Sequence, residues 1–302
     1  MQPSGLVVTV YALRKMRVLI TGASGMLGVD VQAVALATGH EVVALTRADL
    51  DISDLAAVEA AVTDAAPEIV INCAAYTKVD DAEGDGRDAA HLTNGVAPGH
   101  LAGAAATAGA WIVHVSTDYV FDGAKTTGPY LESDATAPQS VYGASKLEGE
   151  LAIAQAAPLS HTIVRSSWLF GNHGSCFPAT MLRLASTHDS LSVVSDQRGC
   201  PTFTPDLAMA LLTVASQQLL GVVHIAGGGE CSWYDFARET ITRAGLGAVV
   251  TPCTTAEFPR PAPRPAYSVL RSGHGEAPVL RDWREGLREY LELRDSTQAP
   301  AR

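Results

Sequence analysis

A short β-branched run that ends in a glycine-rich turn constrains the fold of this 302-residue chain more than any other feature. The run is Arg17-Val-Leu-Ile-Thr21, and the turn that follows is Gly22-Ala-Ser-Gly-Met-Leu-Gly28. Apolar residues then recur at helical spacing, at Leu27, Val31 and Ala35. This order predicts a buried strand, a tight turn and a helix, which is the unit that opens a parallel α/β sheet.

Further segments repeat this alternation of strand and helix. We predict strands at residues 41–45, 68–72, 111–115 and 161–165, and helices at 55–63, at 101–108 and around Tyr142 and Lys146. Strands that alternate with helices imply a doubly wound, Rossmann-like parallel sheet with right-handed crossovers. We therefore predict an α/β fold in which residues 16–166 form a dinucleotide-binding domain.

The regular alternation of strand and helix becomes less clear after residue 166. We predict one more helix at 206–220, a strand at 221–225, a Pro-rich extended loop at 259–265 and a final amphipathic helix at 282–293. We expect residues 167–302 to form mainly a smaller α/β substrate-binding domain. Residues 1–15 are expected to be a flexible extension ahead of Met16, which is a second possible start.

The composition indicates an acidic globular protein. Apolar residues make up 47% of the chain and charged residues 18%, and the formal net charge is −11. This charge disfavours binding to nucleic acid or to an anionic membrane, and no apolar run approaches the ~20 residues that span a bilayer. The five cysteines include no Cys-x-x-Cys pair, so we expect reduced thiols and a cytoplasmic protein.

The glycine turn suits a dinucleotide, because it lets the backbone approach a pyrophosphate at the start of a helix. For a bare glycine triplet, a tight turn without a ligand is the alternative. The residues at the end of the second strand determine whether such a site prefers NAD or NADP. Here they are Thr46 and Arg47, a hydroxyl and a guanidinium, which favour the 2′-phosphate of NADPH. Asp49 and Asp51 lie close by, so NADH stays open, and Arg47 as a solvated loop charge is the other interpretation.

Tyr142 and Lys146 are four residues apart, so a helix places both side chains on one face. In a carbonyl reductase, a tyrosine can supply the proton that meets the developing oxygen charge, and a nearby ammonium draws its pKa toward neutrality. Thr117 and Asp118 follow the fourth strand at the carboxyl edge of the sheet, where a hydroxyl can bond the reacting carbonyl. The alternatives are a solvated lysine and a Ser/Thr/Asp turn that caps a helix.

Five more side chains allow two interpretations. His114 is expected to be a satisfied core histidine rather than a ligand, and Asn94 to cap a helix or hold a water. Trp168 could belong to the core, but it lies just past the fifth strand, where its ring could form a flat wall for a base or sugar. Arg198 and Arg264 lie in loops, either as phosphate ligands or as surface charges.

Several stretches resemble the extended short-chain dehydrogenase/reductase family, and within it the dTDP-4-dehydrorhamnose reductases. They are Asn72-Cys-Ala-Ala-Tyr-Thr-Lys-Val-Asp80, Ser116-Thr-Asp-Tyr-Val-Phe-Asp-Gly123, Val141-Tyr-Gly143 with Lys146, Arg165-Ser-Ser-Trp168, Asp196-Gln-Arg-Gly199 and Arg264-Pro265. The resemblance runs from about Met16 to Leu293. It implies NADPH-dependent reduction of the C4 keto group of dTDP-4-dehydro-6-deoxy-L-mannose to give dTDP-L-rhamnose.

The motifs and the resemblance together predict the site residues. The resemblance implies that Tyr142 is the proton donor, that Lys146 lowers its pKa and binds the nicotinamide ribose, and that Thr117 bonds the reacting oxygen. Besides Tyr142 and Lys146, the predicted cofactor contacts are Gly22, Gly25, Met26, Leu27, Gly28, Thr46, Arg47, Asp51, Ile52, Ala74, Ala75 and Tyr76. The predicted substrate contacts are Thr117, Asp118, Trp168, Arg198 and Arg264.

Two other functions stay open. A non-catalytic regulatory subunit, resembling the β-subunit of methionine adenosyltransferase, could keep the same fold and the same Tyr–Lys pair. An NAD-dependent nucleotide-sugar epimerase is the nearer alternative.

The resemblance also implies that residues 206–226 return to the cofactor sheet. Some relatives pair through a magnesium ion held by three glutamates. Asp30 matches one of these positions by type only, so we predict no metal and leave a homodimer possible.

Overall fold

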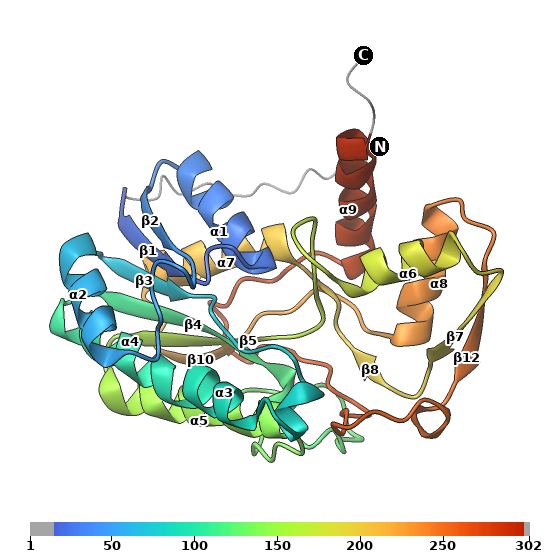
Figure 1. Ribbon diagram of the computed structural model, residues 1–302, viewed down its shortest axis with the longest axis horizontal. Helices are drawn as coiled ribbons and strands as arrows, with labels where there is room; N and C mark the ends of the chain where they lie inside the picture. Colours follow the sequence, from blue (N-terminus) through green and yellow to red (C-terminus); the bar gives the residue numbers. More distant parts are fainter. Residues whose placement is uncertain (1–14, 299–302) are drawn as a thin grey trace.

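The computed structural model describes residues 15–298, so the predicted extension lies almost wholly outside the described residues. Its centre is a six-stranded parallel sheet with the order β10-β5-β4-β3-β1-β2 (Figure 1). The strands are β1 (Arg17–Thr21), β2 (Glu41–Leu45), β3 (Ile69–Asn72), β4 (Trp111–Thr117), β5 (His161–Ser166) and β10 (Gly221–His224). The predicted α/β fold with a doubly wound parallel sheet is confirmed.

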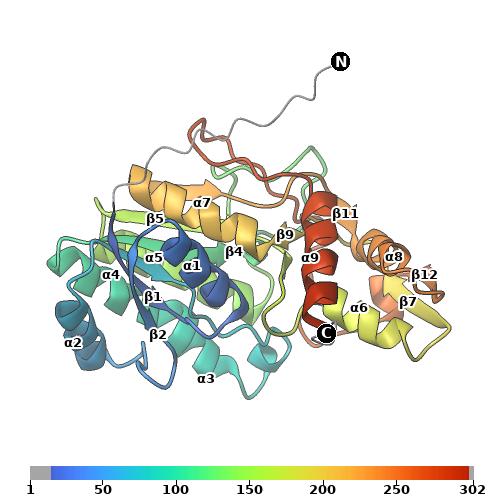
Figure 2. The same ribbon diagram turned by 90° about the horizontal axis from the view of Figure 1, so that it is seen from above.

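Helices cover both faces of this sheet, as Figures 1 and 2 show. On one face lie α1 (Met26–Ala37) and α7 (Thr204–Gln217), and on the other lie α2 (Leu55–Ala65), α4 (Ala97–Thr107) and α5 (Val141–Ala156). In β1, Val18 and Ile20 face the first group while Leu19 faces the second. Both sides of the strand are therefore buried, which explains why its sequence is an unbroken apolar run.

The sixth strand comes from a distant part of the chain. β10 pairs in parallel with β5, with Gly221 opposite Thr162 and His224 opposite Arg165. α7, which precedes β10, packs beside α1 through Leu207. Residues 204–224 thus complete the sheet after the chain has left it.

A second group of elements lies at the end of the molecule away from α2 (Figures 1 and 2). It contains the parallel pair β7 (Ser190–Val194) and β12 (Val249–Cys253), with α6 (Phe177–Ala185) and α8 (Trp233–Arg243). Phe170, Phe203 and Phe236 form an aromatic core with Trp283 and Tyr290 of α9 (Trp283–Gln298). None of β7, β12, α6 and α8 was predicted from the sequence.

The remaining elements are short. They are α3 (Arg87–Ala90), a π-helical turn at His91–Val96, 3₁₀ turns at Asp81–Glu83, Asp118–Val120 and Thr255–Glu257, and the two-residue strands β6 (Leu169–Phe170), β8 (Arg198–Gly199), β9 (Thr202–Phe203) and β11 (Cys231–Ser232). Between residues 15 and 298, no helix is both long and apolar enough to cross a membrane.

Two element boundaries matter for the site. β4 runs two residues beyond the predicted strand, so Ser116 and Thr117 belong to the sheet edge itself. α5 begins at Val141 because the Ser140 hydroxyl accepts a hydrogen bond from the Gly143 backbone N–H at 3.1 Å. This cap places Tyr142 in the first turn of the helix, directly beside the end of β4.

Candidate active site

The glycine turn lies where the carboxyl ends of β1 and β3 meet. Gly22 has a φ of +68°, and a Cβ on it would lie 2.5 Å from the backbone nitrogen of Ala74. A Cβ on Gly28 would lie 2.2 Å from the carbonyl oxygen of Gly22. Only glycine fits these two positions, because the turn packs against the β3 loop and against itself.

The start of α1 suits an anionic group. Its N-terminal cap is Gly25, which has no side chain to satisfy the first backbone N–H groups, so Met26, Leu27 and Gly28 open the helix toward the sheet edge. Such a helix end binds a phosphate through its N–H groups and its dipole. The turn therefore fits the pyrophosphate of a dinucleotide.

The loop after β2 holds both of its acids in local turns. The Thr46 backbone N–H and hydroxyl donate to Asp49 Oδ2 at 2.9 and 2.6 Å, and the Ser53 hydroxyl donates to Asp51 Oδ1 at 2.7 Å. These hydrogen bonds lower the pKa of both carboxyls. Arg47 is exposed and makes no salt bridge with any residue that the structure describes. Ile52, by contrast, is buried.

The loop after β3 is clamped to α5 by a buried asparagine. Asn94 Oδ1 accepts from the Tyr76 backbone N–H at 2.8 Å, and its Nδ2 donates to the Tyr76 carbonyl at 3.0 Å and to the Ser145 hydroxyl at 3.1 Å. Asn94 lies in the π-helical turn and is fully buried. It therefore fixes Ala74, Ala75 and Tyr76 at the sheet edge, a role that the sequence did not suggest.

Thr117, Tyr142 and Lys146 converge at this edge. The Lys146 side chain is 1% exposed, and its Nζ donates to the carbonyl oxygen of Val115 at 2.7 Å. The Thr117 hydroxyl lies close enough to the Tyr142 phenol to act against the rise in the pKa of the tyrosine. Thr117 also donates to Asp118 Oδ1 at 3.1 Å. α5 and β4 thus bring together the three residues that were expected to do the chemistry.

His114 is the site residue that sequence reasoning missed. We expected a core histidine, and it is fully buried, but its Nε2 lies 3.0 Å from Lys146 Nζ. Its Nδ1 lies 2.9 Å from Nδ2 of Asn72, the last residue of β3. The sequence offered one signal for this contact. The third and fourth predicted strands are neighbours in the sheet, and this pairing places residues 72 and 114 side by side.

Burial dominates the charge states in the site. It raises the pKa of Tyr142 to about 12, and it lowers the pKa of Lys146 to about 8 although Glu150 and Cys73 raise it. The expected downward shift of the tyrosine pKa is therefore not present here, because desolvation of the phenolate outweighs the neighbouring hydrogen bond. Burial also raises the pKa of Asp118 to about 6, against the hydroxyls of Ser268 and Thr117.

Trp168 forms part of an aromatic wall. It stacks on Trp233 with ring centroids 3.5 Å apart and an interplanar angle of 5°, and its φ is +50°, which is rare for a bulky residue. A Cβ on Gly199 would lie 2.4 Å from the indole, so this glycine makes room for the ring. Backbone strain of this kind is found preferentially at ligand sites.

A cavity of about 800 Å³ extends from this wall toward the Pro-rich loop. Tyr119, Trp233, Asp80 and Arg264 are among the residues that line it. Arg264 donates to both Asp80 oxygens, at 2.6 and 3.1 Å. Arg198, on β8, donates to Glu230 Oε1 at 2.8 Å. Both arginines predicted to meet phosphates are therefore paired with carboxylates in this structure.

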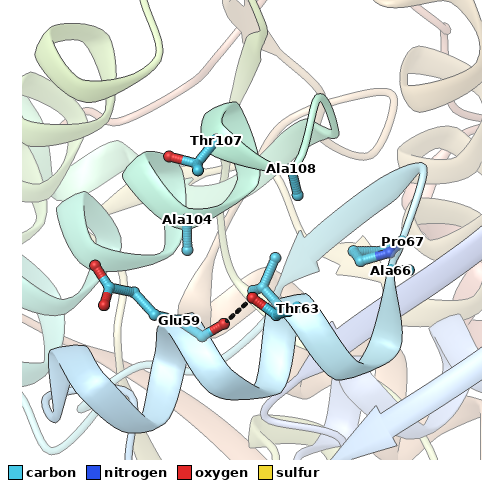
Figure 3. Close-up of a pocket in the computed structure, with 8 residues that line it drawn as sticks. Glu59, Thr63, Ala66, Pro67, Ala104, Thr107 and Ala108 are labelled. Carbon is cyan, nitrogen blue, oxygen red and sulfur yellow. Dashed lines mark hydrogen bonds between the residues drawn. The ribbon is translucent and has the colours of Figure 1, made fainter.

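A second hollow, of about 560 Å³, lies between α2 and α4 (Figure 3). Figure 3 shows Glu59, Thr63 and Thr107 around it, with the Thr63 hydroxyl bonded to the Glu59 carbonyl oxygen at 2.7 Å. It is formed by the C-terminal ends of both helices, and the chain enters β3 and β4 from there. This is the edge of the sheet opposite the one that carries Tyr142.

Comparison with known proteins places the chain in a family. The RmlD substrate binding domain matches residues 16–295. A dTDP-4-dehydrorhamnose reductase from Mycolicibacterium smegmatis is 45% identical over 281 residues, 91% of this chain and 85% of that protein. A probable dTDP-4,6-dihydroxy-2-methyloxan-3-one 4-ketoreductase from Streptomyces antibioticus is 46% identical over 282 residues, 91% of this chain and 94% of that protein.

A solved structure supports the same relationship. The dTDP-4-dehydrorhamnose reductase from Bacillus anthracis in complex with NADP is 36% identical, with a TM-score of 0.88. The match covers 93% of this chain and 100% of that one. The resemblance found in the sequence is confirmed, and the chain belongs to the family of the RmlD substrate binding domain, the dTDP-4-dehydrorhamnose reductase branch of the extended short-chain dehydrogenases/reductases.

Proposed function

We propose that the protein uses NADPH to reduce the C4 keto group of dTDP-4-dehydro-6-deoxy-L-mannose, which gives dTDP-L-rhamnose. The observation that carries this proposal is the convergence of Thr117, Tyr142 and Lys146 beside the glycine turn, at the carboxyl edge of the sheet. Open α/β sheets bind their ligands at this edge. The names of the relatives point to the same chemistry.

In the proposed cofactor site, the backbone N–H groups of Gly22, Gly25, Met26, Leu27 and Gly28 hold the pyrophosphate. The exposed guanidinium of Arg47 binds the 2′-phosphate, and the Thr46 hydroxyl donates to it after turning away from Asp49, while Asp51 and Ile52 flank the adenine. Ala74, Ala75 and Tyr76 line the middle of the cofactor, and Lys146 donates to the nicotinamide ribose. NADPH, when bound, supplies the hydride.

Tyr142 is the proposed proton donor. Hydride addition to C4 leaves charge on the ketone oxygen, and the Tyr142 hydroxyl gives its proton to that oxygen. The high pKa of the half-buried phenol keeps this proton in place until the oxygen becomes basic. Thr117 donates a hydrogen bond to the same oxygen, which stabilises the charge as it develops. Lys146, when protonated, offsets the charge of the phenolate that remains.

The proposed substrate site uses the wall and the cavity beside Tyr142. Asp118 contacts the sugar, and Trp168, with Trp233 stacked behind it, supports the substrate. Arg264 and Arg198 bind the diphosphate after exchanging their carboxylate partners for phosphate oxygens. The exchange keeps each guanidinium paired with an anion, because its N–H groups donate equally well to a carboxylate and to a phosphate.

The test is turnover by the purified protein, followed as loss of the absorbance of the reduced nicotinamide. The substrates are dTDP-4-dehydro-6-deoxy-L-mannose and its D-gluco isomer, each with NADPH and with NADH. We expect oxidation of NADPH with the L-manno ketone. A regulatory subunit would oxidise neither cofactor with either sugar. An epimerase would consume no reduced cofactor and would convert one sugar into another.

A further inference from the structure

A buried chain of polar side chains reaches Lys146 from inside the sheet. Thr21, Asn72 and His114 lie side by side on β1, β3 and β4, and each is at most 1% exposed. The Thr21 hydroxyl donates to Asn72 Oδ1 at 2.8 Å, Asn72 Nδ2 lies 2.9 Å from His114 Nδ1, and His114 Nε2 lies 3.0 Å from Lys146 Nζ.

A backbone amide fixes the direction of the bonds in this chain. The Ala74 N–H donates to Asn72 Oδ1 at 3.0 Å, and a backbone N–H can only donate. That end of the carboxamide must therefore be its oxygen. The other end is Nδ2, which has no lone pair to offer and must donate to His114 Nδ1. His114 Nδ1 is consequently unprotonated.

The imidazole must then carry its single proton on Nε2. His114 is neutral, because burial and the nearby Lys146 hold its pKa well below the usual value for histidine. Its Nε2–H points at Lys146 Nζ, and an ammonium group has no lone pair with which to accept that bond. A neutral amine does have one. It can accept from Nε2–H, donate to the Val115 carbonyl oxygen and keep one N–H for a ligand.

We propose that Asn72 and His114 are positioning residues that control the charge of Lys146, because the Nε2–H that they enforce stabilises the neutral amine and disfavours the ammonium. Neither residue touches the reacting atoms in our account. Their influence on the reaction passes through Lys146 alone, and in that respect the inference rests on the proposed function.

Other groups around Lys146 act on its charge as well. Glu150 lies one turn further along α5 and favours the ammonium, but its carboxylate is shared with Arg165 of β5, at 2.7 Å, and with the Ser116 hydroxyl. Cys73, just beyond β3, favours the ammonium only when it is a thiolate, and burial raises its pKa to about 12, so at neutral pH it is an uncharged thiol. Tyr142 on α5 is also neutral. The Nε2–H of His114 is therefore the donor that bonds the lysine nitrogen directly from the interior.

The charge of Lys146 can be measured directly, because the chain contains only four lysines, Lys15, Lys78, Lys125 and Lys146. We would label the lysine ε-carbons with ¹³C, assign Lys146 from the Lys146→Arg variant, and follow its NMR shift with pH in the cofactor-free protein. We expect Lys146 to titrate at least one pH unit below the other three. A midpoint at the ordinary lysine value of about 10.4 would overturn the proposal.

Asn72→Leu is the decisive variant. It removes the donor to His114 Nδ1 without adding a charge, so the imidazole can move its proton to Nδ1 and accept from an ammonium at Nε2. We expect the Lys146 midpoint to rise by about one pH unit, the shift that one ordinary hydrogen bond produces. His114→Leu, which removes the Nε2–H itself, should raise it similarly. An unchanged midpoint in both folded variants would contradict the proposal.

Thr21→Val is the matched control. It removes a hydrogen bond from the same buried chain at nearly constant volume, but the Ala74 N–H still fixes the Asn72 carboxamide. The Lys146 midpoint should therefore stay where it is in the unaltered protein. A shift in Thr21→Val as large as that in Asn72→Leu would mean that loosened packing moves the lysine, and the proposal would fail. The titration needs no substrate, so its outcome is independent of the reductase assay.

Discussion

At the level of a single residue, Asp118 shows how burial changes the pKa of a side chain. Its carboxyl is almost fully buried beside Thr117, and its pKa is raised from 3.8 to about 6. A carboxyl whose pKa is higher in the folded than in the unfolded state favours folding while it is protonated. That contribution is complete below about pH 4 and is lost as the pH rises through about 6.

Asp118→Asn should therefore stabilise the protein at neutral pH, because the amide carries no charge to desolvate. We expect the free energy of unfolding in urea to rise by up to about 3 kcal/mol at pH ~8, and to change little at pH ~4. The exposed Asp189→Asn serves as the control and should show no such pH dependence. Equal effects of Asp118→Asn at both pH values would contradict the account of this carboxyl.

The predicted preference for NADPH over NADH also depends on a single residue, Arg47. Asp49 and Asp51 are tied into their own turns by Thr46 and Ser53, which leaves the exposed guanidinium as the group free to meet a 2′-phosphate. Arg47→Asp should shift the ratio of kcat/KM for NADPH over NADH toward NADH by about tenfold or more. Arg288→Asp on α9 makes the same change in net charge at a distance. An unchanged ratio in Arg47→Asp would show that the 2′-phosphate is bound elsewhere.

At the scale of elements, α5 can carry Tyr142 to the sheet edge only because its glycines allow close packing. A Cβ on Gly143 would lie 2.2 Å from the Tyr119 carbonyl oxygen. Gly103 of α4, in contrast, has open space where its Cβ would be. Alanine at these two helical glycines should therefore have opposite effects on the free energy of unfolding.

Gly103→Ala should raise the free energy of unfolding by about 0.5–1 kcal/mol, because alanine is the better helix former. Gly143→Ala should lower it by about 1–3 kcal/mol through overpacking, and should reduce turnover by moving Tyr142 away from Thr117. Thermal or urea unfolding measures the first effect, and kcat the second. A stabilised and fully active Gly143→Ala would contradict the packing described here.

The elements that the sequence predicted are those with strong local signals. β1, β3 and β4 each contain an apolar run buried on both faces, so their positions follow from hydrophobicity alone. β7 pairs with β12 across a long stretch of intervening chain, and only Leu191 and Val193 of its residues are buried. Such a strand is fixed by its partner rather than by its own residues, which is why it was not predicted.

The same reasoning applies to the site. Tyr142, Lys146 and the glycine turn were predicted because their spacing is local. The contact between His114 and Lys146 was not, because periodicity reports that residue 114 is buried but not which side chain from another element reaches it. The upward pKa shift of Tyr142 escaped prediction for a related reason, since desolvation depends on the full packing around the phenol.

At the scale of the whole molecule, the negative net charge of the protein repels anions that approach the site. The formal net charge is −11, while Arg264 and Arg198 are each neutralised by a carboxylate. An anionic nucleotide sugar is therefore repelled until it reaches the cavity. We expect kcat/KM for the sugar to rise when the ionic strength increases from about 0.01 M to about 0.1 M, because salt screens this field. A steady fall instead would mean that the local arginines dominate the approach.

The most direct test of the account is single-turnover reduction by Tyr142→Phe, measured together with NADPH affinity. The variant keeps the ring but lacks the hydroxyl that supplies the proton, so hydride transfer to the ketone should slow by about 10²–10⁴-fold. Its dissociation constant for NADPH should stay within a few-fold of that of the unaltered protein. Turnover close to that of the unaltered protein would contradict the assignment of Tyr142 as the proton donor.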